Sequence, residues 1–180
     1  MPSPGLKIRL LGDPCLRAKS KPVQEVGAPE RMLINALFAA MEYSKGVGLA
    51  APQVGIAEQI FVVDTGKEAF AVVNPRILQS TGSDVMEEGC LSIPGVHVNV
   101  RRGKSILVEF IDEYNRQVSA QLSGLTAKVF QHEFDHLQGK LIIDYLPANE
   151  RERITSQMKS GTYIPKEKES KSNADLSRKI

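Results

Sequence analysis

The sequence predicts a protein of the α+β class, in which mixed or antiparallel β-strands pack around a central helix, with one further helix near each end of the chain. Two observations carry this prediction. Apolar residues recur at three- and four-residue spacing in separate stretches, which is the periodicity of a helix with a buried face. Between these stretches lie segments rich in β-branched and aromatic residues, joined in pairs by short polar turns, as expected for antiparallel hairpins.

The N-terminal helix is predicted over residues 30–45, where the apolar positions lie on one face and Gly46 follows as a stop signal. The apolar positions of this helix are Met32, Leu33, Leu37, Phe38 and Met41. Two hairpins follow it along the chain. We predict that residues 59–64 pair with 69–78, and that residues 106–112 pair with 116–122.

The central helix is predicted over residues 125–137, with Gly139 in a suitable position after its end. We expect this helix to be buried, because its apolar residues spread around most of the circumference. These residues are Leu125, Val129, Phe130, Phe134 and Leu137. A last amphipathic helix is predicted over residues 149–158.

The 180 residues are enough for one substantial core, and we expect a single domain over residues 1–165, followed by a polar, mobile tail at 166–180. The 23 basic and 21 acidic residues leave a net charge of +2, which gives no reason to expect sequence-specific binding of nucleic acid. No apolar run approaches the roughly 20 residues of a membrane span, so no membrane association is expected.

The first residues lack the basic and apolar regions of a secretory signal, so we expect the protein in the cytoplasm. That compartment is reducing. Cys15 and Cys90 are therefore not expected to form a disulfide, and a cysteine near histidines is more often a ligand, a nucleophile or buried filler.

The strongest local pattern is His132-Glu133-Phe134-Asp135-His136. Residues four apart on a helix differ by about 40° in direction, so both imidazoles project from one face within reach of one ion. Glu133 lies beside them, where it could act as a general base without being a ligand. An ordinary histidine pair is the alternative, but polar groups in an apolar helix are costly to bury unless they are paired or bind a metal.

Two imidazoles leave such an ion short of a third protein ligand. Cys90 is favoured, because a thiolate is a strong ligand and because the other cysteine, Cys15, has no chemically active residues near it in the sequence. Residues 89–95 have turn residues at both ends, which would constrain the position of Cys90. His97 remains the competitor. Three protein ligands would leave a position open for water, which is typical of catalytic sites, whereas a structural site needs a fourth ligand.

Residues 46–55 form a glycine-rich segment that does not fit a phosphate-binding loop, because it lacks the terminal Gly-Lys-Ser/Thr and follows a predicted helix. Its small residues allow a ligand to approach the backbone closely, and Gln53 is the side chain among them that can form hydrogen bonds. A flexible connection between a helix and a strand is the alternative.

Three separated segments, read together, resemble the signature motifs of the peptide deformylases. They are Gly-Val-Gly-Leu-Ala-Ala-Pro-Gln at 46–53, Glu-Gly-Cys-Leu-Ser at 88–92 and Gln-His-Glu-Phe-Asp-His-Leu at 131–137, in the family's order. Gly-Asp-Pro-Cys-Leu-Arg at 12–17 also resembles the usual opening of the family. The resemblance covers residues 8–146 and is specific, since the His-Glu-x-x-His pattern alone would admit many metalloproteases.

The resemblance implies a metal-dependent hydrolase that removes the formyl group from the N-terminal formylmethionine of newly synthesised polypeptides and releases formate. It also implies that Cys90 is the third metal ligand, together with His132 and His136. Members of the family characteristically work with one Fe(II) ion, although zinc, nickel or cobalt can occupy the site. One cysteine and two histidines suit several late first-row metals, so the residues do not choose among these ions.

These roles lead to a mechanism. The ion would lower the pKa of a bound water, and Glu133 would take the proton and pass it to the departing amine. Negative charge would develop on the formyl oxygen, where the Gln53 amide and the Leu91 backbone N–H could stabilise it.

The methionine side chain of such a substrate requires an apolar pocket near the metal. Val129 and Leu125, about one and two turns before His132, are candidates for its walls together with Val47, and ordinary core positions are the alternative. In the family, backbone groups around the first motif and after the cysteine pair with the extended peptide. Here that points to Gly48 and to residues 93–95.

The chain departs from the family pattern at His97. Some bacterial members carry an arginine close to this position that contacts the peptide, whereas the next arginines here are Arg101 and Arg102. The substrate contacts on that rim therefore stay open. Glu88 and Arg102 could form an ion pair, which we expect to lie on the surface without a functional role.

Members of the family act as nascent chains leave the ribosome, and in some of them a C-terminal helix makes that contact. Arg151, Arg153 and Lys159 in the last predicted helix are suitable for contact with the ribosome near its exit tunnel but are unspecific.

Three other readings remain. A zincin-type protease uses the same helical motif, but it would normally need a histidine or a glutamate downstream as third ligand. No histidine follows His136, and the only glutamates there are Glu150, Glu152, Glu167 and Glu169. A metal-stabilised binding module would need four protein ligands. A deformylase-like protein could act on another acylated amine, although the presence of Glu133 and Gln53 argues against loss of activity.

Overall fold

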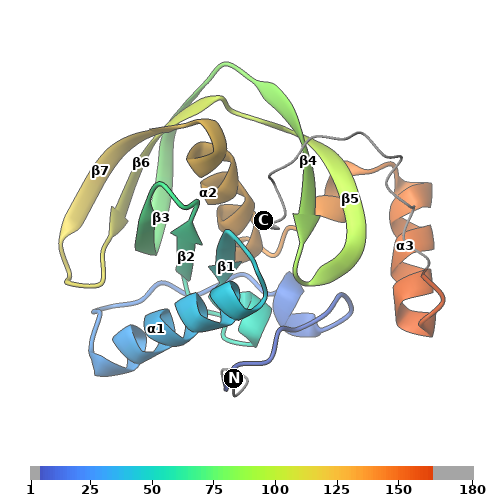
Figure 1. The fold of residues 1–180 in the computed structure, drawn as a ribbon, viewed down its shortest axis with the longest axis horizontal. Coiled ribbons are helices and arrows are strands. Elements are labelled where there is room, and N and C mark those ends of the chain that lie inside the picture. Colours follow the sequence, from blue (N-terminus) through green and yellow to red (C-terminus); the bar gives the residue numbers. More distant parts are fainter. Residues whose placement is uncertain (1–4, 164–180) are drawn as a thin grey trace.

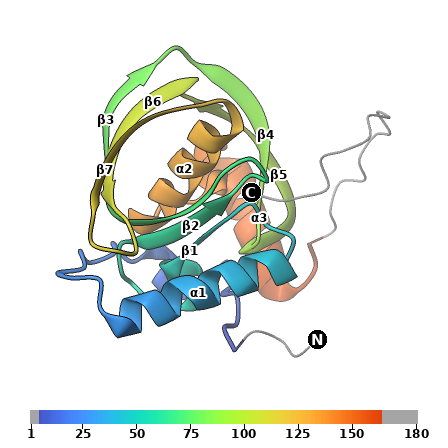
Figure 2. The same ribbon diagram turned by 60° about the vertical axis from the view of Figure 1, so that its left-hand side comes forward.

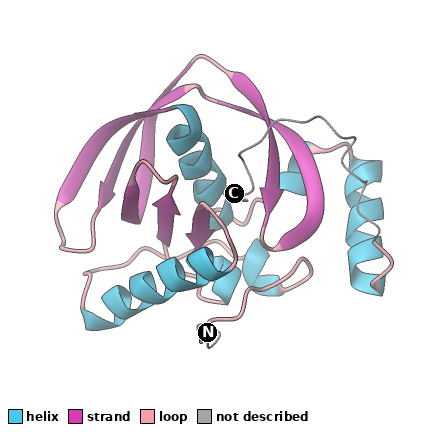
Figure 3. Ribbon diagram, viewed as in Figure 1, coloured by secondary structure: helices cyan, strands magenta, loops and turns pink. Residues whose placement is uncertain are grey.

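Antiparallel strands enclose the central helix α2 (Gly124–Leu137), as Figure 1 shows. The structure is a computed structural model that describes residues 5–163. The helices α1 (Ala28–Tyr43) and α3 (Ala148–Ser160) lie outside the strands, which Figure 3 makes clear by colour. The predicted α+β class, with antiparallel strands around the helix that carries His132 and His136, is confirmed.

Within the described residues, seven strands form two antiparallel sheets. The larger sheet has the order β1-β2-β3-β6-β7, and β4 and β5 form a second, two-stranded sheet. Figure 2 shows α2 inside the space that the strands surround. The strands are β1 (Gly48–Ala50), β2 (Ile60–Asp64), β3 (Ala69–Thr81), β4 (Asp84–Cys90), β5 (Ile93–Arg102), β6 (Ser105–Ile111) and β7 (Gln117–Ser123).

Both predicted hairpins are present, since β2 pairs with β3 and β6 pairs with β7. β3 continues past the predicted end at residue 78, because its last residues pair with β6 as far as Thr81. The prediction missed the hairpin of β4 and β5 and took residues 89–95 as an isolated turn. That turn is the tight connection at residues 91 and 92, and it lies directly after Cys90.

The three predicted helices are present with small shifts at their ends. α1 begins two residues before the predicted start at residue 30, because the Glu30 carboxylate accepts a hydrogen bond of 2.7 Å from the Gly27 N–H and Pro29 lies in the first turn. Three short 3-10 helices complete the described chain. They are η1 (Pro14–Arg17), η2 (Ala51–Val54) and η3 (Ile142–Tyr145).

β2 is buried on both faces, because α2 covers one face of the sheet and α1 covers the other. Successive side chains of a strand point to opposite faces. Accordingly, Phe61 and Val63 pack in the core under α2, whereas Ile60 and Val62 pack in the core under α1. A third apolar cluster joins β5 to η3 and α3. The ends of α2 and β4 are thus held between well-packed elements.

The prediction of a single domain over residues 1–165 stays a prediction, and the predicted tail at 166–180 lies outside the described residues. Within residues 5–163, no helix has the length and apolar character needed to cross a membrane.

Candidate metal centre and active site

Three segments that are far apart in the sequence meet around α2. The end of β4 carries Cys90, η2 carries Gln53, and α2 carries His132, Glu133 and His136. The three metal ligands predicted from the sequence are all buried, with exposed fractions of 1% to 2%. Their ligand atoms lie within 4.8 Å of one another, which is close enough for one ion.

Each histidine presents a defined nitrogen. The Nδ1 atom of His132 lies 2.9 Å from the Glu88 carboxylate, so its Nε2 atom is left for another partner. The Nε2 atom of His136 lies 3.4 Å from the sulfur of Cys90. The competitor of Cys90, His97, is exposed on β5 and is not part of the cluster. The geometry therefore favours Cys90 over His97 as the third ligand.

Burial controls the protonation of these groups. Burial lowers the pKa of His136 well below its usual value, and the nearby positive charges act in the same direction, so its imidazole is neutral and able to bind a metal. Burial raises the pKa of the Cys90 thiol to about 12. A thiolate at this position therefore needs a strong positive charge beside it.

Glu88 connects His132 to a buried network of charges. Arg102 donates two hydrogen bonds to Glu88, at 2.7 and 2.8 Å, and a third of 2.7 Å to Asp135. Burial on its own would raise the pKa of Glu88, but the hydrogen bonds from Arg102 and His132 outweigh it and hold the pKa at about 2. The Tyr145 hydroxyl donates a further hydrogen bond of 2.7 Å to Asp135.

The expectation that Glu88 and Arg102 form a surface pair was wrong. Their side chains are exposed by 0% and 4%. Pairing of β4 with β5 brings both side chains toward α2, where His132 and Asp135 lie. A carboxylate that orients a metal-binding imidazole in this way is a common feature of protein metal sites.

Glu133 is buried completely, and neither of its carboxylate oxygens has a hydrogen-bond partner among the described residues. Burial raises its pKa well above the usual value, and the charge of Glu88 raises it further. Gly48 makes room for this carboxylate. A Cβ atom at residue 48 would overlap Glu133 Oε1 and would lie 2.8 Å from Val129 Cγ1. The first motif therefore packs directly against the third.

The side chain of Gln53 extends from η2 to the cluster of Cys90, His132 and His136. Its Nε2 atom donates to Ser92 Oγ at 3.3 Å and to Cys90 Sγ at 3.6 Å, while its Oε1 atom accepts from the Ala50 N–H at 2.8 Å. Leu91 follows Cys90 in the turn between β4 and β5 and is partly buried. The first motif thus also packs against the second.

The candidate walls of a methionine pocket lie in one apolar cluster. Val47 and Val129 are buried in the core between the sheet and α2, and Leu125 packs against that core while partly exposed.

Cys15 and Cys90 are free thiols.

Sequence reasoning missed the contributions of Ser92, Asp135 and Tyr145. Ser92 lies in the second motif and Asp135 in the third, so their positions in the sequence could have indicated that they lie near the site. Tyr145 lies outside every motif, and nothing in the sequence links it to Arg102.

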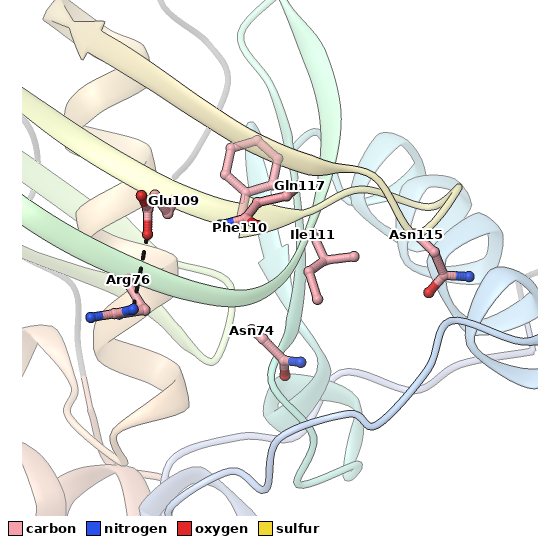
Figure 4. Close-up of a pocket in the computed structure, with 7 residues that line it drawn as sticks. All are labelled: Asn74, Arg76, Glu109, Phe110, Ile111, Asn115 and Gln117. Carbon is pink, nitrogen blue, oxygen red and sulfur yellow. Dashed lines mark ion pairs between the residues drawn. The ribbon is translucent and has the colours of Figure 1, made fainter.

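Figure 4 shows a separate pocket of about 340 Å³ that is lined by residues of β3, β6 and β7 and of the turn before β7. None of the residues that line it is a predicted site residue. Asn74 and Asn115 there have left-handed backbones, with φ of 50° and 61°, and each uses its amide to bind the backbone of the N-terminal loop. Arg76 and Glu109 on the same surface form an ion pair at 3.9 Å, in which Arg76 is exposed and Glu109 partly exposed, so its contribution to stability is small.

The residues of the cluster fit one divalent ion of the late first row. Buried polar atoms without partners are rare in proteins, and each costs about 1–3 kcal/mol. His132 Nε2, the nitrogen left free by the contact of Nδ1 with Glu88, is such an atom among the described residues. A neutral imidazole pair with one cysteine is also the chemical donor set that such ions prefer.

A helix with two histidines and an unpaired buried carboxylate, enclosed by antiparallel strands next to a buried cysteine, is the arrangement expected of a metal-dependent hydrolase. Residues 6–152 match the polypeptide deformylase family. The chain belongs to this family, and the predicted enzyme class, a peptide deformylase, is confirmed.

Curated relatives agree over most of their length. The chain is 44% identical to the peptide deformylase of Pseudothermotoga lettingae over 153 residues, which cover 84% of this chain and 89% of the relative. It is 45% identical to the peptide deformylase of Halothermothrix orenii over 143 residues, which cover 78% of this chain and 93% of the relative.

Solved structures have the same fold. The peptide deformylase of Legionella pneumophila superposes with a TM-score of 0.80 at 38% identity, covering 86% of this chain and 95% of that chain. The Synechococcus elongatus peptide deformylase in complex with actinonin gives a TM-score of 0.82 at 34% identity, covering 91% of this chain and 90% of that chain.

Proposed function

We propose that Cys90, His132 and His136 hold one divalent metal ion with which this deformylase removes the formyl group from the N-terminal formylmethionine of newly synthesised polypeptides, releasing formate. The observation that carries this proposal is the buried cluster of three ligand atoms within 4.8 Å, next to the unpaired carboxylate of Glu133. Three protein ligands leave a coordination position for a reactant, as catalytic sites require.

The favoured ion is Fe(II), and zinc, nickel or cobalt suit the same donors. When bound, such an ion supplies a Lewis acid that lowers the pKa of water toward neutrality and polarises the formyl carbonyl. The hydrogen bond between Glu88 and His132 Nδ1, at 2.9 Å, supports the metal-binding tautomer of this imidazole.

Glu133 is the proposed general base. Its raised pKa means that it accepts a proton readily in this buried setting. It takes the proton of the attacking water and then donates it to the nitrogen of the departing amine. Because neither oxygen is engaged by another described residue, both are available for this transfer.

Gln53 and Leu91 are the proposed donors to the oxyanion that develops on the formyl oxygen. The carboxamide of Gln53 faces the cluster with its NH₂ group, since its oxygen is occupied by the Ala50 N–H. The backbone N–H of Leu91 directly follows Cys90, at the start of the turn between β4 and β5. Such donors typically contribute about 10²–10³ in rate.

We assign the methionine pocket to Val47, Leu125 and Val129, and the pairing with the peptide backbone to Gly48. Their position in one apolar cluster beside Glu133 supports this assignment. Backbone pairing would tolerate many sequences after the methionine. We further propose that the enzyme works in the cytoplasm on nascent chains near the ribosomal exit tunnel, with the basic residues of α3, Arg151, Arg153 and Lys159, as the contact surface.

The test is an anaerobic assay of the Fe(II)-loaded protein on formyl-Met-Ala-Ser, with formate release as the readout. We expect turnover that is lost in Glu133→Ala while the metal content stays the same. Formate release no greater than that of the Glu133→Ala control would refute the proposal. The unformylated peptide serves as the second substrate, because its cleavage would instead indicate a protease of the zincin type.

A further inference from the structure

The carboxamide of Gln53 is held at both ends. Its oxygen can only accept and its nitrogen can only donate, so the Ala50 N–H, 2.8 Å from Oε1, determines which end of the carboxamide faces the metal-ligand residues. On the other side, Nε2 finds a hydrogen-bond acceptor in the hydroxyl of Ser92 at 3.3 Å. All three groups are buried, and solvent does not compete for these bonds.

Ser92 is placed to control this orientation. It is fully buried in the tight turn between β4 and β5, two residues after Cys90. Its hydroxyl accepts a hydrogen bond from Gln53. Without the hydroxyl, the Gln53 NH₂ group would keep only the long contact of 3.6 Å to that sulfur.

The N-terminal segment fixes the distance between the two loops that carry Gln53 and Ser92. The Arg9 N–H donates to the backbone oxygen of Gln53 at 2.7 Å, and the Leu11 N–H donates to that of Ser92 at 2.9 Å. Three residues of the N-terminal segment therefore bridge both loops. The Arg9 side chain also lies against Gly55, where a Cβ atom would be 2.9 Å from Nε.

We propose that Ser92 is a positioning residue that acts through Gln53, and that the backbone of residues 9–11 keeps the two side chains at hydrogen-bond distance. The inference rests on the proposed role of Gln53 as an oxyanion donor. Removing the Ser92 hydroxyl lets the carboxamide rotate away, so that turnover falls while the substrate still binds.

A double-mutant cycle tests this. Gln53→Ala should lower kcat about 10²–10³-fold, as for loss of one oxyanion donor. Ser92→Ala should lower kcat about 10-fold with little change in KM. If Ser92 acts through Gln53, the double variant should be no slower than Gln53→Ala alone. Additive losses would overturn the inference, because Ser92 would then act on its own or through Cys90.

Ser20→Ala is the matched control, because Ser20 is also buried and its hydroxyl has no partner among residues 5–163. It should match the wild type in kcat. A readout without turnover is the side-chain NH₂ resonance of Gln53 in ¹⁵N-labelled protein, identified by its loss in Gln53→Ala. Ser92→Ala should shift it and Ser20→Ala should not, and an unshifted resonance in Ser92→Ala would refute the inference.

The backbone bridge has its own test. Leu11→Pro removes the N–H that binds Ser92, while Leu11→Ala removes most of the side chain and keeps the N–H. The proline variant should lose more kcat than the alanine variant and should shift the Gln53 resonance. Equal kcat in the two variants would refute the bridge. If Gln53→Ala itself retains full kcat, the oxyanion role in the proposed function fails, whereas slow Ser92→Ala with an unshifted resonance refutes only this inference.

Discussion

The substitution Gly48→Ala tests how closely the first motif must approach Glu133. The added Cβ would overlap Glu133 Oε1 and would lie 2.9 Å from Glu133 Cδ and 2.8 Å from Val129 Cγ1. Ordinary contacts begin near 3.4 Å, so Glu133 or the backbone of β1 must move by about half an ångström or more. Misplacement of a reacting group by about 1 Å can lower the reaction rate about 10²-fold, so we expect kcat to fall roughly 10- to 100-fold.

The assay is formate release from formyl-Met-Ala-Ser, with metal content measured on the same samples. Metal content should stay normal, because Glu133 is not one of the three ligand residues. The comparison variant is Gly89→Ala, next to Cys90, where a Cβ would meet only ordinary contacts at 3.5 Å and beyond. Its loss of kcat should be much smaller. If Gly48→Ala kept its kcat within about twofold, Glu133 would not need its present position and the reasoning would fail.

Four further outcomes are expected. Glu133→Ala should lower kcat about 10²–10⁴-fold at unchanged metal content, and activity near that of the wild type would rule it out as the base. Arg102→Met should destabilise the protein by about 3–5 kcal/mol in urea unfolding, since it leaves Glu88 buried without its partner, whereas Arg76→Ala at the exposed pair should cost little. Asp144→Asn should reduce the loss of unfolding free energy at acid pH, measured by urea unfolding at a series of pH values. Hydrogen bonds from Arg17 and the Leu141 N–H, with the charge of Arg17, outweigh burial and lower the pKa of Asp144 below its usual value of 3.8. The stability that the ionised Asp144 contributes is therefore present well above pH 3.8 and is lost as the pH falls through the lowered pKa. Equal slopes in the two proteins would contradict this. Asn115→Ala should cost about 1–3 kcal/mol by losing two bonds to Val26 and placing alanine at a φ of 61°, and Asn115→Gly, which removes only the bonds, should cost less.

Much of the fold was predictable because its helices and hairpins follow periodic patterns. α1, α2, α3 and the two flanking hairpins were found from residue spacing alone. The hairpin of β4 and β5 was missed although β5 carries a period-two signal, in which Val96, Val98 and Val100 are buried between exposed neighbours. Its partner β4 reads Asp-Val-Met-Glu-Glu-Gly-Cys, which is poor in strand-forming residues, and it becomes a strand through pairing with β5.

The site residues were predictable where a motif carried them, and their environment was not. The spacing of His132 and His136 predicts a shared face, and the structure has both on one side of α2 near Cys90. The burial of Glu88 depends on the register of β4 with β5 and on the packing of both against α2. That is tertiary information. A charge pattern in one strand could not distinguish a surface pair with Arg102 from a buried one.

The buried charges around α2 also bear on what the site holds. Within residues 5–163, Arg102 is the one lysine or arginine that is buried, and its hydrogen bonds go to Glu88 and Asp135. Glu133 is buried without such a partner, and Cys90 is a third group nearby that would be negative as a ligand. Isolated buried charges are costly unless they are paired or coordinate a metal. One divalent cation beside Cys90 would offset the thiolate and lower the cost of ionising Glu133, so the ion that provides the Lewis acid would also allow the buried carboxylate to serve as a base.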